Sequence, residues 1–342
     1  MKTTLKLFAL VLFVNFLTGC KHDPLDIDTS KVELAPIVVK RLDKDLLKIN
    51  ESNIAQQSAE LQKKYSTFYV RYISNIVNNG GRINDSSYNQ NMFAFLKDKE
   101  MNLAFKEVEA MYSDNDIELL GEELTEAVKR YKVFFPERKT PKQFVTFMSG
   151  FNYNVVYVDS TIGLGLEMYL GENNEFYNML QFPKFRTRAM NKHHLLSDAV
   201  RGWVITEFDN TDTPVNNLLY HMIFYGKIFY VCDALLPQVS DSLKFGYTTK
   251  QLNTCLENEK NYWGFFVKDN KLFENDLKIV SEFTSDGPFT RAISKECPPR
   301  VAMWLGRQIV KSYMEHNKDV TLSDLMNEKD SQKILSKSKY KP

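Results

Sequence analysis

The hydrophobic positions of the chain are densest between residues 216 and 237, where the sequence reads NNLLYHMIFYGKIFYVCDALLP. Apolar side chains recur there at helical intervals, and others fill most of the remaining circumference. A helix that is apolar on nearly every side lies inside a protein. A membrane-spanning helix needs about 20 apolar residues, and Lys227 and Asp233 interrupt this run. The pattern therefore predicts a buried helix whose few polar members are His221, Tyr225, Lys227 and Asp233.

Helical spacing also dominates the first third of the chain. Apolar residues recur at three and four through 51–78, and Asn79-Gly80-Gly81 is a stop that tolerates left-handed backbone. The stretch 88–135 repeats this spacing in two or three pieces, broken at 113–116. Further helices are predicted at 192–208, 248–268 and 299–313. In the last of these, Gly306 allows another element to pack closely.

A small sheet is predicted after Pro136, where the pattern changes. Gln143–Met148 and Asn154–Tyr169 are rich in Val, Ile, Tyr and Phe, which favour strands, and residues 149–152 between them are typical of a turn. Gly163 and Gly165 allow a bulge or a close backbone approach. The fold class predicted is therefore α+β, mostly helical, with a small β-sheet near 142–170.

The N-terminus has the pattern of a lipoprotein signal. Lys2 and Lys6 precede an apolar core, and Leu17-Thr18-Gly19-Cys20 matches the site that is cut before a lipidated cysteine. We therefore expect acyl chains on Cys20 to anchor the mature protein to a lipid bilayer. The domain organisation predicted is a signal peptide at 1–19, a tether at 20–31, one α+β domain at 32–327 with helical halves around the sheet, and a loose lysine-rich tail at 328–342.

The charge of the chain bears on whether it binds nucleic acid, and its cysteine content limits the disulfides it can form. The formal charge is +1, and removing the signal peptide with its two lysines leaves a nearly neutral chain, so nothing indicates a nucleic-acid partner. Beyond Cys20 the chain has Cys232, Cys255 and Cys297. An odd number of cysteines in an exported protein permits at most one internal disulfide, and the pattern does not select the pair.

Catalytic motifs are incomplete. The chain lacks a phosphate-binding loop and a GxSxG nucleophile turn. A zinc-peptidase helix carries His-Glu-x-x-His, whereas His221 is followed four residues later by Tyr225, without an intervening glutamate. Adjacent histidines point to different faces of a helix, so His193-His194 is interpreted as a surface or capping pair. We therefore predict no catalytic residue, no metal site and no cofactor.

Burial of charged side chains on the apolar helix requires partners. An unpaired buried charge costs several kcal/mol, so Lys227 and Asp233 are expected to pair, with Glu207, Asp198 and Arg307 as possible partners, or to lie at an exposed edge. The candidate cleft residues are His221, Tyr225, Lys227, Asp233 and Arg307. Tyr262 and Trp263 are further candidates for the wall of a groove.

Several sequence blocks together resemble the gliding-motility lipoprotein GldB family of Bacteroidetes. These are FFPERKTPKQFVTFMSGFNYNVVYVD, GLGLEMYLG, HMIFYGKIFYVCDALLP, DSLKFGYT and LGRQIVKSYM, in collinear order over most of the mature chain. That family is distantly similar to predicted zinc peptidases, so the resemblance implies a zincin-like core helix bundle whose His-Glu-x-x-His motif is not intact here. It also implies an accessory of gliding motility and type IX secretion.

Three functional hypotheses follow. The first is a noncatalytic lipoprotein that contacts other envelope proteins from the periplasmic face of either membrane or from the cell surface. The second is an active or substrate-binding peptidase-like hydrolase, which requires His221 and two further ligands to converge. The third is a peptide- or glycan-binding lipoprotein that uses the cleft.

Overall fold

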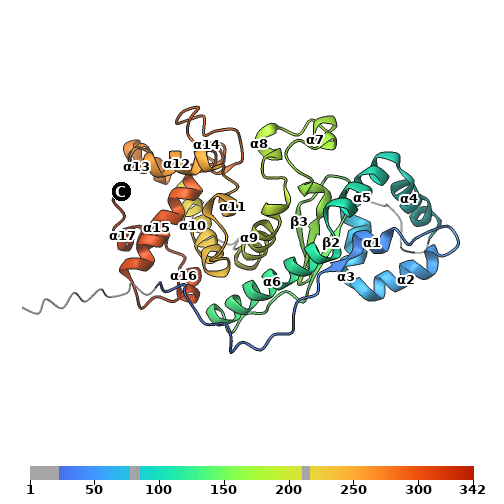
Figure 1. The fold of residues 1–342 in the computed structure, drawn as a ribbon. Helices are drawn as coiled ribbons and strands as arrows, with labels where there is room; N and C mark the ends of the chain where they lie inside the picture. Colours follow the sequence, from blue (N-terminus) through green and yellow to red (C-terminus); the bar gives the residue numbers. More distant parts are fainter. Residues whose placement is uncertain (1–22, 78–82, 84, 210–215) are drawn as a thin grey trace, which may run out of the picture.

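Helices account for most of the computed structural model, which describes residues 23–77, 83, 85–209 and 216–342 (Figure 1). The α+β, mostly helical class is confirmed. Cys20, the predicted lipidation site, and Asn79-Gly80-Gly81, the predicted stop, lie outside the described residues.

The helices of the N-terminal half are α1 (Leu42–Leu46), α2 (Ile54–Tyr65), α3 (Thr67–Arg71), the π-helical turn η1 (Tyr72–Ile76), α4 (Ser86–Lys97), α5 (Lys99–Met111) and α6 (Asp114–Phe134). The predicted helix at 51–78 is thus divided at Ser66, whose φ is 52°. The predicted helical stretch at 88–135 consists of three pieces. Ser113 begins the last one with a capping box to Asp116, which confirms the predicted break.

The helices after the sheet are η2 (Leu166–Tyr169), α7 (Glu175–Met179), α8 (Lys184–Thr187), η3 (Lys192–His194), α9 (Leu195–Phe208), α10 (Leu218–Leu235), α11 (Asp241–Phe245), α12 (Thr249–Glu257), α13 (Glu259–Val267), η4 (Lys268–Phe273), α14 (Leu277–Thr284), α15 (Val301–His316), α16 (Leu322–Asn327) and α17 (Ser331–Ser338). The predicted helices at 192–208, 216–237, 248–268 and 299–313 are therefore present, the third as the pair α12 and α13.

The sheet has four strands in the order β1-β2-β4-β3. The strands are β1 (Lys40–Arg41), β2 (Gln143–Phe147), β3 (Val155–Val158) and β4 (Thr161–Gly165). β2 is parallel to both β1 and β4, whereas β3 pairs antiparallel with β4 and forms one edge. α9 packs against β3 and β4.

The prediction of one strand at 154–169 is wrong. This segment is a hairpin of β3 and β4 followed by η2, and the turn is at Asp159 and Ser160, with φ values of 44° and 65°. Two positive φ values match the twist of a tight hairpin, but this turn usually contains Gly or Asn. An Asp-Ser pair gives a weak turn signal, which explains the missed hairpin.

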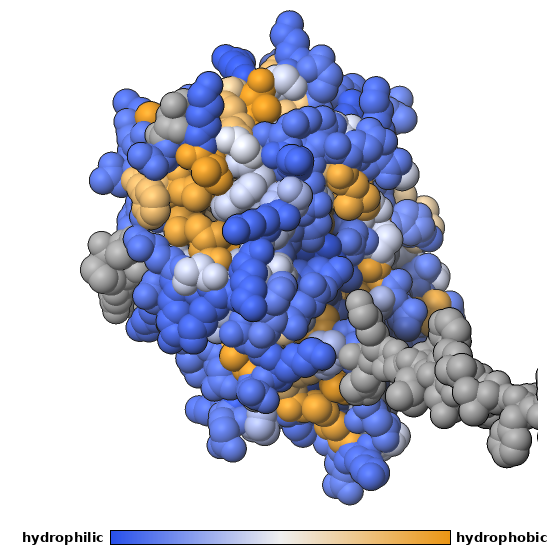
Figure 2. Space-filling view, turned by 90° about the vertical axis from the view of Figure 1, so that its left-hand side faces the viewer, coloured by the Kyte–Doolittle hydropathy of each residue, from blue (hydrophilic) through white to orange (hydrophobic). Residues whose placement is uncertain are grey.

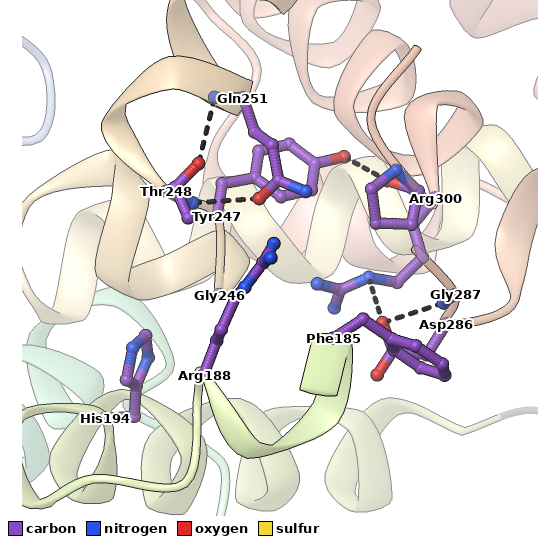
Figure 3. A pocket seen from close by; sticks show the side chains of 11 residues that line it. Phe185, Arg188, His194, Gly246, Tyr247, Thr248, Gln251, Asp286, Gly287 and Arg300 are labelled. Atoms are coloured by element: carbon purple, nitrogen blue, oxygen red, sulfur yellow. Dashed lines mark hydrogen bonds and ion pairs between the residues drawn. The ribbon is translucent and has the colours of Figure 1, made fainter. Parts of the chain in front are cut away.

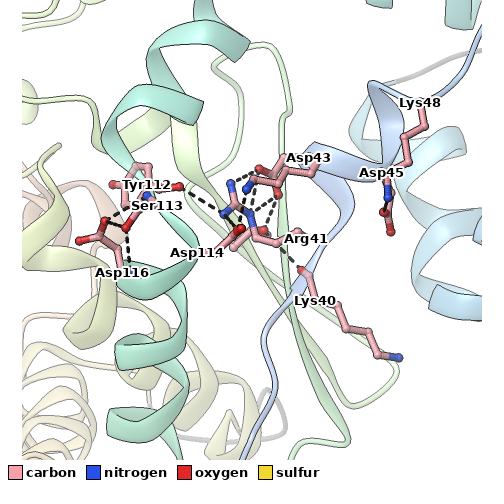
Figure 4. Close-up of polar contacts among 11 residues, drawn as sticks. Lys40, Arg41, Asp43, Asp45, Lys48, Tyr112, Ser113, Asp114 and Asp116 are labelled. Atoms are coloured by element: carbon pink, nitrogen blue, oxygen red, sulfur yellow. Dashed lines mark hydrogen bonds and ion pairs between the residues drawn. The ribbon is translucent and has the colours of Figure 1, made fainter.

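A polar cluster joins the start of the domain to the sheet and to α6 (Figure 4). Arg41 Nη2 lies 2.6 Å from Asp43 Oδ2, and Thr146 on β2 donates to Asp43 Oδ1 over 2.5 Å. Arg41 also donates to the carbonyl of Tyr112 just before α6. Because Asp43 is almost completely buried, these contacts satisfy a carboxylate that would otherwise be costly to bury.

The core of the C-terminal half is the crossing of α10 and α15. A Cβ atom placed on Gly306 would lie 1.8 Å from the carbonyl oxygen of Met222, and one on Gly226 would lie 2.3 Å from the backbone of Gly306. The two helices therefore touch backbone to backbone, which confirms the predicted close packing at Gly306. Within the described part of the chain, no helix combines the length and apolar character needed to cross a membrane.

The N-terminal segment is not a free spacer where the structure describes it. From Asp23 onward the chain runs along α6 with two turns and no helix or strand before β1 (Figure 1). Thr29 donates to Glu126 over 2.8 Å, and the amide of Ile37 donates to Thr125 Oγ1 over 2.8 Å. The described part of the predicted 20–31 tether is thus attached to the domain.

The predicted loose tail at 328–342 contains helix α17 instead. Ile334 and Ser338 are fully buried, and Ser312 on α15 donates to the carbonyl of Ser338. The lysine-rich composition concealed a short helix with one apolar face, which packs on α15.

Candidate functional site

The predicted cleft residues on α10 lie in separate environments. His221 Nε2 is 2.6 Å from Asn216 Oδ1, and burial lowers the pKa of this histidine. Tyr225 is half-buried beside the ring of Phe224. Lys227 is 7% exposed and donates to the carbonyl of Glu328, and burial lowers its pKa to about 8.

Asp233 and Arg307 belong to a buried ion-pair cluster. Arg307 Nε lies 2.8 Å from Asp233 Oδ2, and Lys244 Nζ lies 2.9 Å from Asp233 Oδ1. Arg307 Nη1 also lies 3.0 Å from Asp241 Oδ2. Burial alone would lower the pKa of Arg307, but the two aspartates raise it. This cluster joins α10, α11 and α15, so the Asp233–Arg307 pairing considered above has a structural role.

The other sequence candidates are also separated. Tyr262 is buried, whereas Trp263 is half-buried with its ring against Tyr340. Among the described residues, no three His, Cys, Asp or Glu side chains come close enough together to hold a metal ion. The cysteines after Cys20 are buried free thiols, and burial raises the pKa of Cys232 to about 12 and that of Cys297 to about 11.

A cleft lies instead between the sheet, α9 and the segment that precedes α15. Its main part has a volume of about 460 Å³ and is lined by residues 152–155, by Arg186, Ala189 and Met190, by one side of α9, and by Gly246, Asp286 and Arg300. A smaller hollow of about 40 Å³ shares Gly246, Asp286 and Arg300 with it and adds Arg188 and His194. We name the two together the arginine cleft, because Arg186, Arg188, Arg201 and Arg300 line it.

Figure 3 shows how the smaller hollow is built. Arg188, which follows α8, and Arg300, which precedes α15, extend from opposite sides toward the same space. His194, at the end of η3, lies to the left of Arg188 in this view, and its Nδ1 is 3.3 Å from the carbonyl of Leu243. Burial lowers the pKa of His194, which favours the neutral form of its imidazole.

Asp198 and Arg201 form a fixed pair on the side of α9 that faces the cleft. Arg201 Nη2 lies 2.6 Å from Asp198 Oδ1, and the hydroxyl of Tyr169 donates to Asp198 Oδ2 over 3.0 Å. Arg201 Nη1 donates to the carbonyl of Lys244 over 2.7 Å. Burial lowers the pKa of Arg201, but Asp198 raises it above its usual value. Both side chains are therefore held by contacts within the protein.

The loop at 149–154, which forms one wall, is held by a buried glutamate. Glu167 Oε1 accepts hydrogen bonds from the amide and the hydroxyl of Ser149 and from the amide of Phe151. Glu167 is fully buried, and burial raises its pKa although these bonds oppose the shift. Close approach at Gly165 also fixes the loop, because a Cβ there would lie 2.1 Å from the carbonyl oxygen of Tyr153.

Arg300 has an unusual backbone and an incompletely satisfied side chain. Its φ of 56° and ψ of 27° are left-handed, a conformation that costs a residue other than glycine about 1 kcal/mol or more. Nη2 donates to the carbonyl of Phe245 over 2.6 Å. Nε is buried, and among the described residues it has no hydrogen-bond acceptor, since Asp286 Oδ1 is 3.5 Å away. Strain and an unsatisfied donor thus coincide at the junction of the two hollows.

Exposed apolar side chains form a second surface feature. Val267, Phe273, Leu277 and Ile279, around the end of α13 and the start of α14, are each more than a third exposed. Figure 2, which views the molecule from the side of the C-terminal helices, shows hydrophobic patches within a largely hydrophilic surface. Nothing in the structure identifies what would cover them, so the arginine cleft is the stronger candidate.

Sequence reasoning missed the cleft because its walls come from distant parts of the chain. The available signals were local and weak: Asp198 and Arg201 are three apart on one helical face, and Arg300 follows two prolines. Neither pattern indicates a site until the fold brings residues 152, 186, 201 and 300 together.

Comparison with known proteins identifies the family. No curated protein and no solved structure matches the chain. The family model described as gliding motility protein GldB matches residues 22–342, which is nearly the whole chain. The chain therefore belongs to the GldB family of gliding motility proteins.

Proposed function

We propose that this protein is a lipid-anchored, noncatalytic accessory of the gliding-motility machinery that holds a partner in the arginine cleft. Membership of the GldB family supports the role in motility. The signal sequence and Cys20 support anchoring at the cell envelope, through a lipid rather than a helix.

One observation carries the noncatalytic part of the proposal. α9 packs on the sheet and forms a wall of the arginine cleft, yet its cleft-facing Asp198 is bound to Arg201 and Tyr169. A general base must be free to accept a proton from the reacting group. A carboxylate held by a guanidinium and a phenol is a poor base, so α9 is better suited to shape and charge a binding surface.

A degenerate zinc-peptidase-like scaffold is compatible with this arrangement. In such a scaffold, two histidines four apart on one helix bind the metal. α9 contains no histidine between Leu195 and Phe208, and α10 contains only His221. We propose that the protein retains a peptidase-like cleft without the ligands for a catalytic metal.

Elemental analysis tests the noncatalytic proposal. The full chain, purified in detergent and dialysed against dilute zinc, is expected to retain far less than one zinc per chain. One tightly held zinc per chain that is lost in His221→Ala would support the peptidase-like hydrolase instead. Asn258→Ala is a control, because Asn258 is a polar residue outside α10 and the arginine cleft.

Fractionation of cells tests the anchor. Cys20→Ala is expected to remain uncleaved or to leave the membrane fraction, because the modified cysteine is the acylation site in this pattern. Cys255→Ala is the matched control, since this cysteine is buried in the domain. Unchanged processing and unchanged membrane association of Cys20→Ala would contradict the lipoprotein assignment.

A further inference from the structure

We infer that the arginine cleft binds the carboxylate of a peptide segment from a partner protein. This inference rests on the proposed binding role and specifies the chemistry of the partner. Its basis is the balance of charges in the cleft, the donors that the fold leaves unsatisfied, and the apolar wall beside them.

The balance of charges favours an anion. Four arginines and two aspartates line the arginine cleft. Asp198 is already bound to Arg201 and Tyr169, and Asp286 is about half exposed and makes only a 3.5 Å contact with Arg300. Two of the four guanidinium charges therefore have no carboxylate partner within the lining of the cleft.

These charges belong to Arg186 and Arg188, beside Arg300. In the described part of the chain, no carboxylate lies within ion-pair distance of Arg186, whose guanidinium is 4.9 Å from the ring centre of Phe182. Among the described residues, Arg188 has its ion-pair contact with Glu172, over 3.7 Å, and both side chains are about half exposed. A long contact between exposed groups contributes little, so Arg188 can exchange it for a ligand.

Arg300 adds a directed donor. Its Nη2 is held by the carbonyl of Phe245, which fixes the plane of the guanidinium, while the buried Nε still lacks an acceptor. A planar guanidinium with free N–H groups matches the two oxygens of a carboxylate. Arg188 and Arg300 both line the smaller hollow, so a carboxylate there would bring a negative charge close to both guanidinium groups.

The rest of the lining indicates a peptide rather than a small ion. Beside the arginines, the main part of the cleft is lined by Val155, Met190 and Ile205, and by the half-exposed ring of Tyr153. A volume of about 460 Å³ exceeds what a bare anion needs and is typical of pockets for molecules with an apolar body. An acidic or C-terminal peptide segment presents both kinds of group.

The position of the cleft also favours a protein partner over a lipid headgroup. The described chain begins beside α16, whereas α8 and the segment before α15, which form the cleft, lie at the other side of the molecule in Figure 1. A protein held by its N-terminus would therefore direct the arginine cleft away from its own anchor.

Fluorescence anisotropy with a short labelled peptide of alternating valine and aspartate tests this inference. The full chain is purified in a neutral detergent, and three further peptides carry an amidated C-terminus, asparagine in place of aspartate, or both changes. Binding is expected for the acidic peptide and is expected to weaken with salt. Loss on amidation alone would identify the C-terminal carboxylate as the ligand, and loss on the asparagine change alone would identify side-chain carboxylates.

Arginine variants locate the site. Arg186→Gln combined with Arg188→Gln is expected to weaken the acidic peptide at least tenfold, because both side chains lose their charge at the cleft. Arg138→Gln is a control for the type of substitution, since it removes one positive charge from an ion pair with Glu207 outside the cleft. Both changes are at partly exposed positions, and thermal unfolding verifies that each variant is folded.

Three results would overturn the inference. These are equal binding of the doubly changed neutral peptide, undiminished binding by the folded double variant, and binding of inorganic phosphate without binding of any peptide. The titration does not depend on acylation or on metal content. Failure of the anchoring or zinc experiments is therefore distinguishable from failure here.

Discussion

α9 and α10 are neighbouring helices that differ in what their side chains contact. α10 is the more apolar, and it is buried against α15 through backbone contact at Gly226 and Gly306. α9 has one buried face and one face that carries Asp198 and Arg201 into the arginine cleft. The more hydrophobic helix, α10, therefore holds the C-terminal half together. α9, which has both apolar and charged faces, offers a surface for binding.

The largest effect is expected from Gly306→Ala. A Cβ there would lie 1.8 Å from the carbonyl oxygen of Met222, so α10 and α15 must separate, which should lower the free energy of unfolding by more than about 3 kcal/mol. Urea denaturation measures this. Gly264→Ala is the control, because no atom lies within 4 Å of a Cβ at this exposed position of α13. Gly264→Ala should raise the free energy of unfolding by about 0.5–1 kcal/mol. Similar changes for the two variants would contradict the backbone contact between α10 and α15.

Asp233→Asn should have the next largest effect. The change leaves Arg307 and Lys244 buried with only Asp241 to balance them, at an expected cost of about 2–3 kcal/mol in the free energy of unfolding. Asp319→Asn is a control at an exposed position near the end of α15. Equal unfolding curves for the two variants would show that the cluster does not stabilise the crossing of α10 with its neighbours.

Lys227 predicts a dependence on pH. Its pKa falls from 10.5 to about 8 on folding, so between these values the unfolded chain binds the proton more strongly than the folded chain does. The contribution of Lys227 to the free energy of unfolding is therefore constant below pH 8 and rises between pH 8 and 10.5. From pH 7 to pH 9 it rises by about 1.4 kcal/mol. Lys227→Met should lose this rise, whereas Lys311→Met, at an exposed position of α15, should keep it. The comparison requires urea denaturation at both pH values.

Arg188→Gln should have the smallest effect on stability. Its contact with Glu172 is long and exposed, so the free energy of unfolding should change by less than about 0.5 kcal/mol. A small change in stability together with weaker peptide binding would show that the arginine cleft serves binding. It would then differ from the crossing of α10 and α15, which serves packing. A loss of several kcal/mol would mean instead that the arginines of the cleft are part of the core.

Much of the fold follows from the sequence because it depends on periodicity. The spacing of apolar residues predicts α9, α10, α15 and a division of 88–135 into two or three helices, and a single glycine predicts the close crossing at Gly306. The failures are at elements with little periodic signal. β1 has only two residues, the turn at 159–160 has no glycine, and α17 is hidden in a lysine-rich stretch.

The candidate site could not be predicted in the same way. The sequence directs attention to α10, because a histidine or a lysine in an apolar run is conspicuous, but burial there means packing and ion pairing. The arginine cleft depends on which loops meet at the end of α9. The left-handed backbone of Arg300 contributes to this meeting and has no counterpart in residue spacing.

The N-terminal segment along α6 has a mechanical consequence for an anchored protein. Two residues, Lys21 and His22, lie between the proposed lipid site and Asp23, and an extended chain spans at most about 3.6 Å per residue, so the first described residue would stay within about 11 Å of the anchor. From there, hydrogen bonds between Thr29 and Glu126 and between Ile37 and Thr125 fasten the segment sideways to a long helix. A pull on the lipid would load these bonds in shear. The domain would then be rigidly attached near its anchor and would transmit force and orientation, which a flexible linker would not.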